Sequence, residues 1–148
     1  MFSRWFNTIK EKLLSSSLTL ENDSVLENLD TNSMPVDVYS LYQSAKNGNE
    51  SDIFKLGLKY YHGQGVGRNC AYAYEIFRLL QDFDADAEYY MGEICRLGLI
   101  DDGPDYQQAC FHYAVAMEMG HSQGKDKLQL MAELTQDEFW LGILGNLK

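Results

Sequence analysis

The side chains best suited to metal binding or catalysis in this sequence are its three histidines, His62, His112 and His121. None is followed by a second ligand residue three or four positions later, the spacing that places two metal ligands on one face of a helix. The sequence also lacks the GxSxG, HExxH and HxE…CxxC patterns of hydrolases and zinc enzymes. We therefore expect no metal site, no cofactor and no catalytic residue, and an enzyme is the least favoured class of function.

The thiols are a second possible source of chemistry. Cys70, Cys95 and Cys110 are odd in number and show no CxxC spacing, which argues against a disulfide framework or a zinc site. Each lies among apolar neighbours in a stretch of helical periodicity, where a free cysteine behaves as a small hydrophobic residue. A cysteine and a histidine can form a nucleophile pair, but no motif here supports one. Unpaired thiols are typical of a reducing compartment, so we expect a cytoplasmic protein.

Acidic side chains are the main candidates for recognising another molecule. The net charge is −10, which argues against nucleic-acid binding because that depends on Lys and Arg contacts with phosphates. Opposite charges speed association, so a basic protein partner is favoured, with solubility alone as the alternative explanation. Residues 82–88 contain a dense acidic run without the glycine and terminal glutamate of an EF-hand loop. We expect this run to begin a helix and to contribute to an acidic patch.

Two pairs of tyrosines, at 60–61 and 89–90, recur in stretches of helical periodicity. In solenoids of helix pairs the first helix of each pair lines the concave face, and tyrosine is enriched in binding hot spots. We expect Tyr60 and Tyr90 in the core and Tyr61 and Tyr89 at the surface. Together with acidic side chains, the candidate partner-binding residues are Tyr61, Tyr89, Asp82, Asp84, Asp86, Glu88 and Glu93.

The elements that position these residues differ in composition along the chain. Residues 1–14 have an amphipathic helical pattern, residues 15–35 are interpreted as an acidic linker with at most one weak helical turn, and residues 36–148 as a helical repeat domain. The N-terminal segment is expected to dock on its own domain or on a partner, and contact with a membrane surface is possible but not favoured. Its charges interrupt the apolar core that a signal peptide needs, and no apolar run of about 18 residues could span a membrane. The apolar positions of the segment are Phe2, Trp5, Phe6, Ile9, Leu13 and Leu14.

A repeat of about 36 residues organises the rest of the chain. Two glycines of one unit recur 35 residues later, Gly57 as Gly92 and Gly63 as Gly98. Residues 73–77 correspond to residues 109–113 at an offset of 36. A helical repeat of this length is typical of a solenoid of antiparallel helix pairs.

Apolar periodicity, glycines and capping residues predict where the helices begin and end. Gly57 and Gly92 are expected at close helix crossings, and Gly63 and Gly65 in a turn that needs positive φ. Thr135 is expected to cap a last helix that closes the end of the solenoid. The predicted helices span residues 36–47, 51–62, 70–82, 85–97, 105–119, 122–133 and 136–146.

Over residues 45–128 the chain resembles the Sel-one-like repeat, a relative of the tetratricopeptide repeat. The residues that match its pattern are Leu56, Gly57, Tyr60, Gly63, Gly65, Val66 and Ala73 in the first unit, and Ala87, Gly92, Gly98, Ala109, Tyr113, Ala116, Gly120 and His121 in the second. The second unit departs from the pattern, with Cys95 in place of a tyrosine and Ile100 in place of a glycine. The resemblance implies an all-α, short, right-handed solenoid with a C-terminal capping helix.

The resemblance also bears on function. Proteins similar to this family are mostly bacterial and serve as adaptors or scaffolds, and some small ones act as immunity partners of secreted toxins. We expect a non-enzymatic protein-binding module, most specifically a cytoplasmic immunity or inhibitor protein that binds a basic toxin or effector domain. A regulatory or secretion-system adaptor is the alternative.

Overall fold

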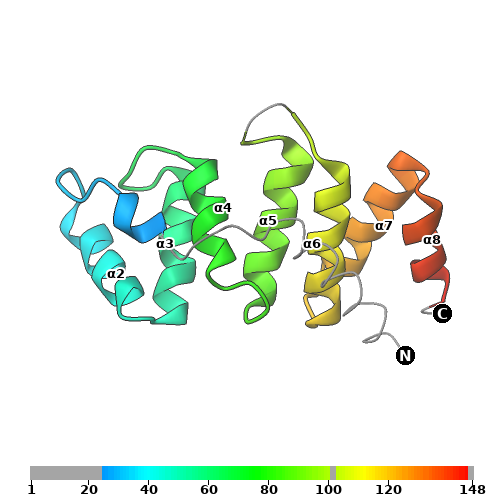
Figure 1. Ribbon diagram of the computed structural model, residues 1–148, viewed down its shortest axis with the longest axis horizontal. Coiled ribbons are helices and arrows are strands. Elements are labelled where there is room, and N and C mark those ends of the chain that lie inside the picture. Colours follow the sequence, from blue (N-terminus) through cyan, green and yellow to red (C-terminus); the bar gives the residue numbers. More distant parts are fainter. Residues whose placement is uncertain (1–24, 101–102, 147–148) are drawn as a thin grey trace.

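The computed structural model describes residues 25–100 and 103–146, in which seven α-helices and one short 3-10 helix are present and no strand occurs. The elements are η1 (Val25–Asn28), α2 (Val36–Lys46), α3 (Glu50–His62), α4 (Cys70–Arg78), α5 (Ala85–Leu97), α6 (Tyr106–Glu118), α7 (Gly124–Thr135) and α8 (Glu138–Gly145). Each α-helix packs mainly against the next one in the chain, so the helices form a row (Figure 1). The all-α prediction is therefore confirmed. The helix predicted at residues 1–14 lies outside the described residues.

Short polar side chains begin five of the seven α-helices. Each is in an extended conformation, and one of its oxygens accepts a hydrogen bond from a backbone N–H of the first turn. A cap of this kind stabilises a helix by about 1 kcal/mol. The capping residues are Asn49 for α3, Asn69 for α4, Asp84 for α5, Asp105 for α6 and Asp137 for α8. Several of the chain's carboxylates are thus committed to helix starts.

Two predicted helix boundaries are wrong. Thr135 does not cap α8; it ends α7, where its hydroxyl donates to the carbonyl of Met131 at 2.8 Å. Asp137, two residues later, is the cap because its carboxylate reaches the N–H groups of Phe139 and Trp140. The helix predicted at 70–82 ends at Arg78, since the chain passes into turns and reaches a positive φ of 73° at Asp82.

Helices α3 and α5 end in the same way, each at a glycine with left-handed backbone. Gly63 has φ 71° and Gly98 has φ 63°, a conformation that costs residues with a Cβ atom roughly 1–2 kcal/mol. A Cβ atom on Gly98 would also lie 2.6 Å from the backbone nitrogen of Pro104. The two turns therefore bring the chain back sharply, so that α4 lies beside α3 and α6 beside α5 (Figure 1).

Glycines inside α3 and α5 let the following helix approach closely. An added Cβ atom on Gly57 would lie 2.5 Å from the ring of Phe77, and one on Gly92 would lie 2.7 Å from the ring of Tyr113. Phe77 and Tyr113 are both completely buried. The two helix pairs thus have the same packing contact, a large ring over a glycine.

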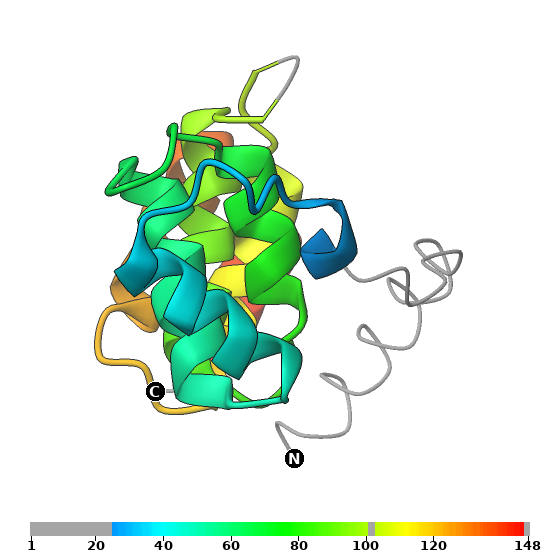
Figure 2. The same ribbon diagram turned by 90° about the vertical axis from the view of Figure 1, so that its left-hand side faces the viewer.

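The buried residues form two groups, one in α2–α5 and one in α6–α8. Leu26 and Leu29, which lie in the range assigned to the linker, are buried in the first group, and η1 packs against α4. Figure 2 shows η1 on the outer side of α4. Among the described residues, no helix has both the length and the apolar character needed to cross a membrane.

Candidate functional site

Four aromatic rings lie in a row across α3, α5 and the turn that precedes α7. The ring of Tyr61 is 5.1 Å from that of Tyr90, which is 5.9 Å from that of Tyr89, and Tyr89 stacks on His121 with ring centroids 4.3 Å apart. All four side chains are partly exposed. We call them the aromatic row. Tyr61 and Tyr89 were predicted at the surface, whereas Tyr90 was predicted in the core and is only partly buried.

The surrounding helices fix the conformation of the aromatic row. The ring of Tyr90 stacks on that of Phe77 at 5.6 Å and has an edge contact with Phe54 at 5.9 Å. Arg68, in the turn after α3, donates from Nε to the carbonyl of Tyr61 at 3.0 Å, and its guanidinium lies 5.9 Å from the Tyr61 ring. The rings are therefore held in place before any ligand binds, which lowers the entropic cost of binding.

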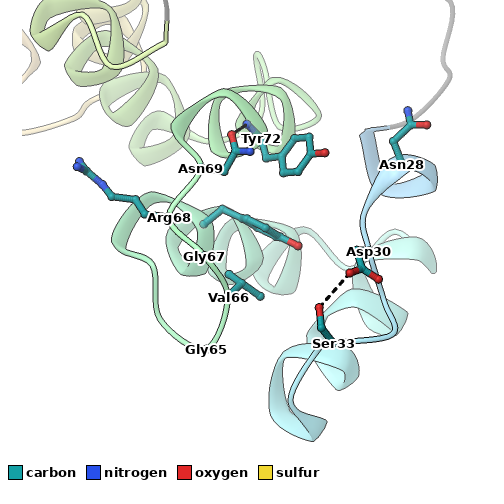
Figure 3. A pocket seen from close by; sticks show the side chains of 10 residues that line it. Asn28, Asp30, Ser33, Gly65, Val66, Gly67, Arg68, Asn69 and Tyr72 are labelled. Atoms are coloured by element: carbon teal, nitrogen blue, oxygen red, sulfur yellow. Dashed lines mark hydrogen bonds between the residues drawn. The ribbon is translucent and has the colours of Figure 1, made fainter.

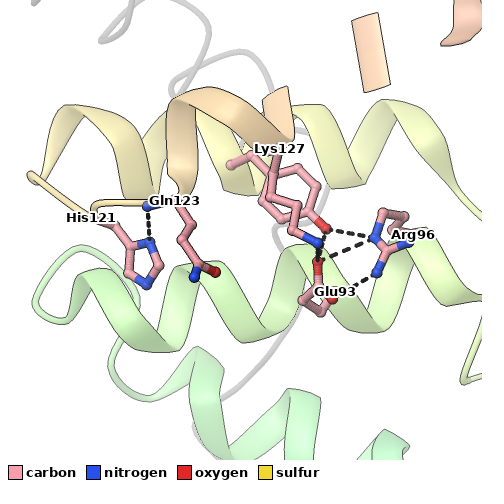
Figure 4. Close-up of polar contacts among 6 residues, drawn as sticks. Glu93, Arg96, His121, Gln123 and Lys127 are labelled. Atoms are coloured by element: carbon pink, nitrogen blue, oxygen red, sulfur yellow. Dashed lines mark hydrogen bonds and ion pairs between the residues drawn. The ribbon is translucent and has the colours of Figure 1, made fainter. Parts of the chain in front are cut away.

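A charged cluster continues the aromatic row toward α7 (Figure 4). Arg96 contacts Glu93 through two bonds, Nη2 to Oε2 at 2.7 Å and Nε to Oε1 at 3.2 Å. The hydroxyl of Tyr113 donates to Glu93 Oε1, and Lys127 Nζ lies 3.3 Å from the same oxygen. Glu93 was predicted to contact a partner. In the structure it is 9% exposed and paired with Arg96 and Lys127. These contacts hold its carboxylate beside the aromatic row.

The pKa values of two tyrosines in the aromatic row are raised. Burial raises the pKa of Tyr61 and of Tyr89, and the nearby charge of Glu93 raises both further. Burial alone would raise the pKa of Glu93 as well, but the hydrogen bonds from Arg96 and Tyr113 outweigh it and the net shift is downward. At neutral pH Tyr61 and Tyr89 are thus neutral phenols beside an ionised carboxylate that is paired within the protein.

His121 connects the aromatic row to one acidic side chain. Its Nδ1 atom accepts a hydrogen bond from the backbone N–H of Gln123 at 3.2 Å (Figure 4). Nε2 lies 3.2 Å from Oδ1 of Asp86. Because Nδ1 accepts, the proton of the neutral ring is on Nε2, which donates to Asp86.

The predicted acidic patch is smaller than expected. Glu88 is completely buried, which contradicts its prediction as a surface residue, and Asp84 uses its carboxylate to cap α5. Asp82 and Asp86 remain exposed. The sequence alone did not separate these residues, because it does not show that position 84 caps α5 or that position 88 lies on the buried face of the helix.

Glu88 belongs to a buried polar chain that the sequence did not reveal. Its Oε2 atom accepts from Nδ1 of His112 at 2.8 Å, and the other ring nitrogen of His112 is 2.9 Å from the hydroxyl of Tyr74. The three residues come from α4, α5 and α6. The one available signal was a histidine within the apolar run ACFHYAVA, since a polar group among buried neighbours requires a polar partner.

The buried chain resembles a proton relay, and the thiol beside it is not in its reactive form. The Cys95 thiol, which hydrogen-bonds to Tyr74, has its pKa raised to about 12 by burial and by the charge of Asp105. Burial and Asp137 raise the pKa of Cys110 to about 12 as well. Both sulfurs are thiols at neutral pH, and the thiolate is the reactive form. The two hydrogen bonds of the buried chain link α4, α5 and α6.

A hollow of about 650 Å³ lies between η1 and the turn after α3 (Figure 3). Asp30, Tyr60 and Tyr72 are among the residues that line it. Asp30 already accepts from Ser33 at 3.1 Å and from the backbone of Asn32 at 3.0 Å, and Arg68 points away from it in Figure 3. The charged groups do not converge on a common point, so the hollow is a weaker candidate than the aromatic row.

Residues 25–100 and 103–146 contain no group of three or more histidine, cysteine, aspartate or glutamate side chains that could hold a metal ion. Comparison of the chain with models of protein families, with curated proteins and with solved structures finds no match in any of the three.

Proposed function

We propose that the chain is a short, right-handed solenoid of Sel-one-like helix pairs. The two pairs share a ring packed over a glycine and a left-handed glycine at the first helix end. They also share a turn closed by one backbone hydrogen bond, from Asn69 to Tyr60 in the first pair and from Asp105 to Cys95 in the second, each 2.9 Å long. These equivalences at offsets of 35 and 36 residues support a structural repeat.

We further propose that the protein works by binding another protein along the face of α3, α5 and α7. The observation that carries this proposal is the aromatic row, in which four rings are partly exposed yet held rigidly by their neighbours. Tyrosine contributes both apolar contact and a hydroxyl donor, and it is enriched among residues that dominate binding energy. Preorganised rings lose little conformational entropy on binding.

The net charge of −10 supports a basic partner, because long-range attraction raises the rate of encounter. An immunity or inhibitor protein that captures a basic toxin or effector domain is the most specific form of the proposal. A regulatory or secretion adaptor is the second candidate, supported by the amphipathic pattern of residues 1–14 as an additional docking element.

Site-specific photocrosslinking in living cells tests the face directly. A benzophenone amino acid replaces Tyr61 or Tyr89, and a matched variant carries it at Tyr39, an exposed tyrosine of α2 outside the aromatic row. We expect the two row positions to capture the same protein and the Tyr39 position not to capture it. Identification by mass spectrometry then shows whether the captured protein is basic. Equal capture at all three positions, or none at the row, would contradict the proposal.

A further inference from the structure

Tyr60 is a nearly buried residue in the wall of the hollow between η1 and the turn after α3. It lines the hollow and is only 5% exposed. Its backbone carbonyl accepts from Asn69, but among the described residues no group forms a hydrogen bond with its hydroxyl. Every side-chain oxygen that is sealed from solvent in the described part of the chain does have such a partner. The Tyr60 hydroxyl is therefore not sealed and opens into the hollow.

Tyr72 forms the adjoining wall. Its ring lies at 90° to that of Tyr60, with centroids 5.7 Å apart, and its hydroxyl likewise has no hydrogen bond to a described residue. Figure 3 shows the Tyr72 ring pointing across the hollow toward η1, where Asn28 lines the other side. An amide side chain has both donors and an acceptor. Two phenols and an amide that can form hydrogen bonds thus border the same space.

The charges around the hollow do not favour an anion or a cation. Arg68, the one cationic side chain among its described lining residues, donates to the carbonyl of Tyr61 and points away from the hollow (Figure 3). A phosphate or carboxylate would therefore have no cation to pair with. Asp30 lies at the exposed rim and already accepts from Ser33 and from the backbone of Asn32. An exposed carboxylate contributes little to an ion pair, but it can accept further hydrogen bonds from neutral hydroxyl groups.

The space also fits a small neutral molecule. The hollow has a volume of about 650 Å³, within the range of roughly 300–1,000 Å³ that is typical of small-molecule sites. Gly67 in its wall has no positive φ, and a Cβ atom added there would meet nothing within 4 Å. Neither backbone conformation nor packing requires a glycine at this position. The turn therefore leaves its backbone open beside the hollow.

We propose that this hollow binds a neutral, polyhydroxylated ligand of the size of one or two sugar rings. The C–H face of a sugar ring packs on the ring of Tyr60 or Tyr72, since aromatic rings offer a large apolar area. Sugar hydroxyls both donate and accept hydrogen bonds, which matches the two phenols, the amide of Asn28 and the carboxylate of Asp30. The hollow shares no lining residue with the aromatic row, so the proposal does not depend on the binding of a protein partner.

The protonation of Tyr60 agrees with this role. Burial raises its pKa, and the nearby Tyr72 and Asp30 raise it further. The hydroxyl is therefore protonated at neutral pH, so it can donate to one oxygen of the ligand and accept from another.

Saturation-transfer difference NMR of the full chain tests the site with three disaccharides, cellobiose, maltose and N,N′-diacetylchitobiose. We expect at least one of them to receive saturation from the protein at millimolar concentration. Tyr60→Phe/Tyr72→Phe removes both hydroxyls and keeps the rings. It should raise the Kd about tenfold, because the ligand hydroxyls lose their partners. Tyr106→Phe, which removes a partly exposed hydroxyl from α6, should leave the Kd unchanged.

Gly67→Leu tests the hollow independently of the tyrosines. The added side chain starts from an open position, so it should narrow the hollow and abolish binding while circular dichroism and thermal unfolding match those of the parent. Binding that survives Gly67→Leu, or equal Kd values for the parent and the double phenylalanine variant, would overturn the proposal. So would the absence of saturation for all three disaccharides, or binding of spermidine in their place, which indicates a cationic ligand.

Discussion

Glu88 and Glu93 lie five positions apart on α5, and the protein compensates their burial in different ways. Glu88 is completely buried and contacts a histidine that bonds in turn to a tyrosine. Glu93 lies at the edge of the aromatic row and is paired with two cations. Removing one partner of a buried ionisable pair costs more free energy than removing a surface contact, because the other group stays desolvated.

His112→Leu should therefore be strongly destabilising. It leaves the buried carboxylate of Glu88 and the hydroxyl of Tyr74 without their shared partner, which should lower the free energy of unfolding by about 3–5 kcal/mol. The double variant Glu88→Leu/His112→Leu should recover part of this loss, since no buried carboxylate then remains. Urea denaturation of the three proteins measures the effect. A single variant within about 1 kcal/mol of the parent would show that the pair does not hold the three helices together.

The pairing of Glu93 predicts how stability depends on pH. Its pKa in the folded protein is below the ordinary value of 4.5, so its contribution is complete above that pH and declines as the pH falls through the lower folded value. Between pH 6 and 3 the melting temperature of the parent should fall more steeply than that of Glu93→Gln. Glu138→Gln, which alters an exposed carboxylate of α8, should follow the parent. Parallel curves for the parent and Glu93→Gln would contradict the prediction.

At the scale of the helices, glycine is required for different reasons at different positions. A Cβ atom on Gly57 would lie 2.5 Å from the Phe77 ring, whereas one on Gly142 in α8 would meet nothing within 4 Å. Gly57→Ala should therefore lower the free energy of unfolding by about 1–3 kcal/mol through overpacking. Gly142→Ala should raise it by about 0.5–1 kcal/mol through helix propensity. A midpoint of Gly57→Ala at or above that of the parent would show that α3 and α4 can move apart at little cost.

Much of the helical architecture could be predicted from the sequence because its signals are local. The apolar periodicity and the turn glycines at 63 and 98 depend on backbone geometry within one or two turns. Thr135 was mistaken for a cap because threonine and aspartate are both good caps, and only the path of the chain selects Asp137.

The candidate site was less predictable because it depends on contacts between helices. Tyr61, Tyr89 and Glu93 do come together, but the sequence does not show that Arg96 and Lys127 neutralise Glu93. Glu88 and His112 are 24 positions apart and pair only because α5 packs on α6. The residue type alone does not show whether a carboxylate is exposed or buried and paired.

At the scale of the whole molecule, α8 is the last helix of the row and packs against α7. It buries Trp140 and Leu144, and each large apolar side chain contributes about 1.5–3 kcal/mol when fully buried. A chain that ends after Gln136 should lose about 3–6 kcal/mol of stability and bind a hydrophobic dye. Thermal unfolding and dye fluorescence measure both effects. An unchanged melting temperature would mean that α8 is not needed as a cap.

The overall charge and the aromatic row should act on different steps of binding. Once the partner is identified, Asp82→Lys and Asp86→Lys should slow association, most strongly at low salt, because exposed charges are screened over about 8 Å at physiological ionic strength. Tyr61→Ala or Tyr89→Ala should speed dissociation about tenfold, corresponding to a loss of about 1.4 kcal/mol. Stopped-flow kinetics separate the two rates. Association that does not respond to charge reversal at any salt concentration would leave solubility as the role of the charge.

The packing of each helix against its neighbours in the chain also governs how the protein folds. The main contacts between helices join helices that are consecutive in the chain, so the loops that must close are short and little loop entropy is lost. Such low contact order places folding in the range of about microseconds to milliseconds. In a linear array, an end element has one neighbour while an inner element has two, so opening begins at the ends and proceeds inward. The buried Glu88–His112 pair lies near the middle of the row, in the part of the chain that would exchange its amide hydrogens last.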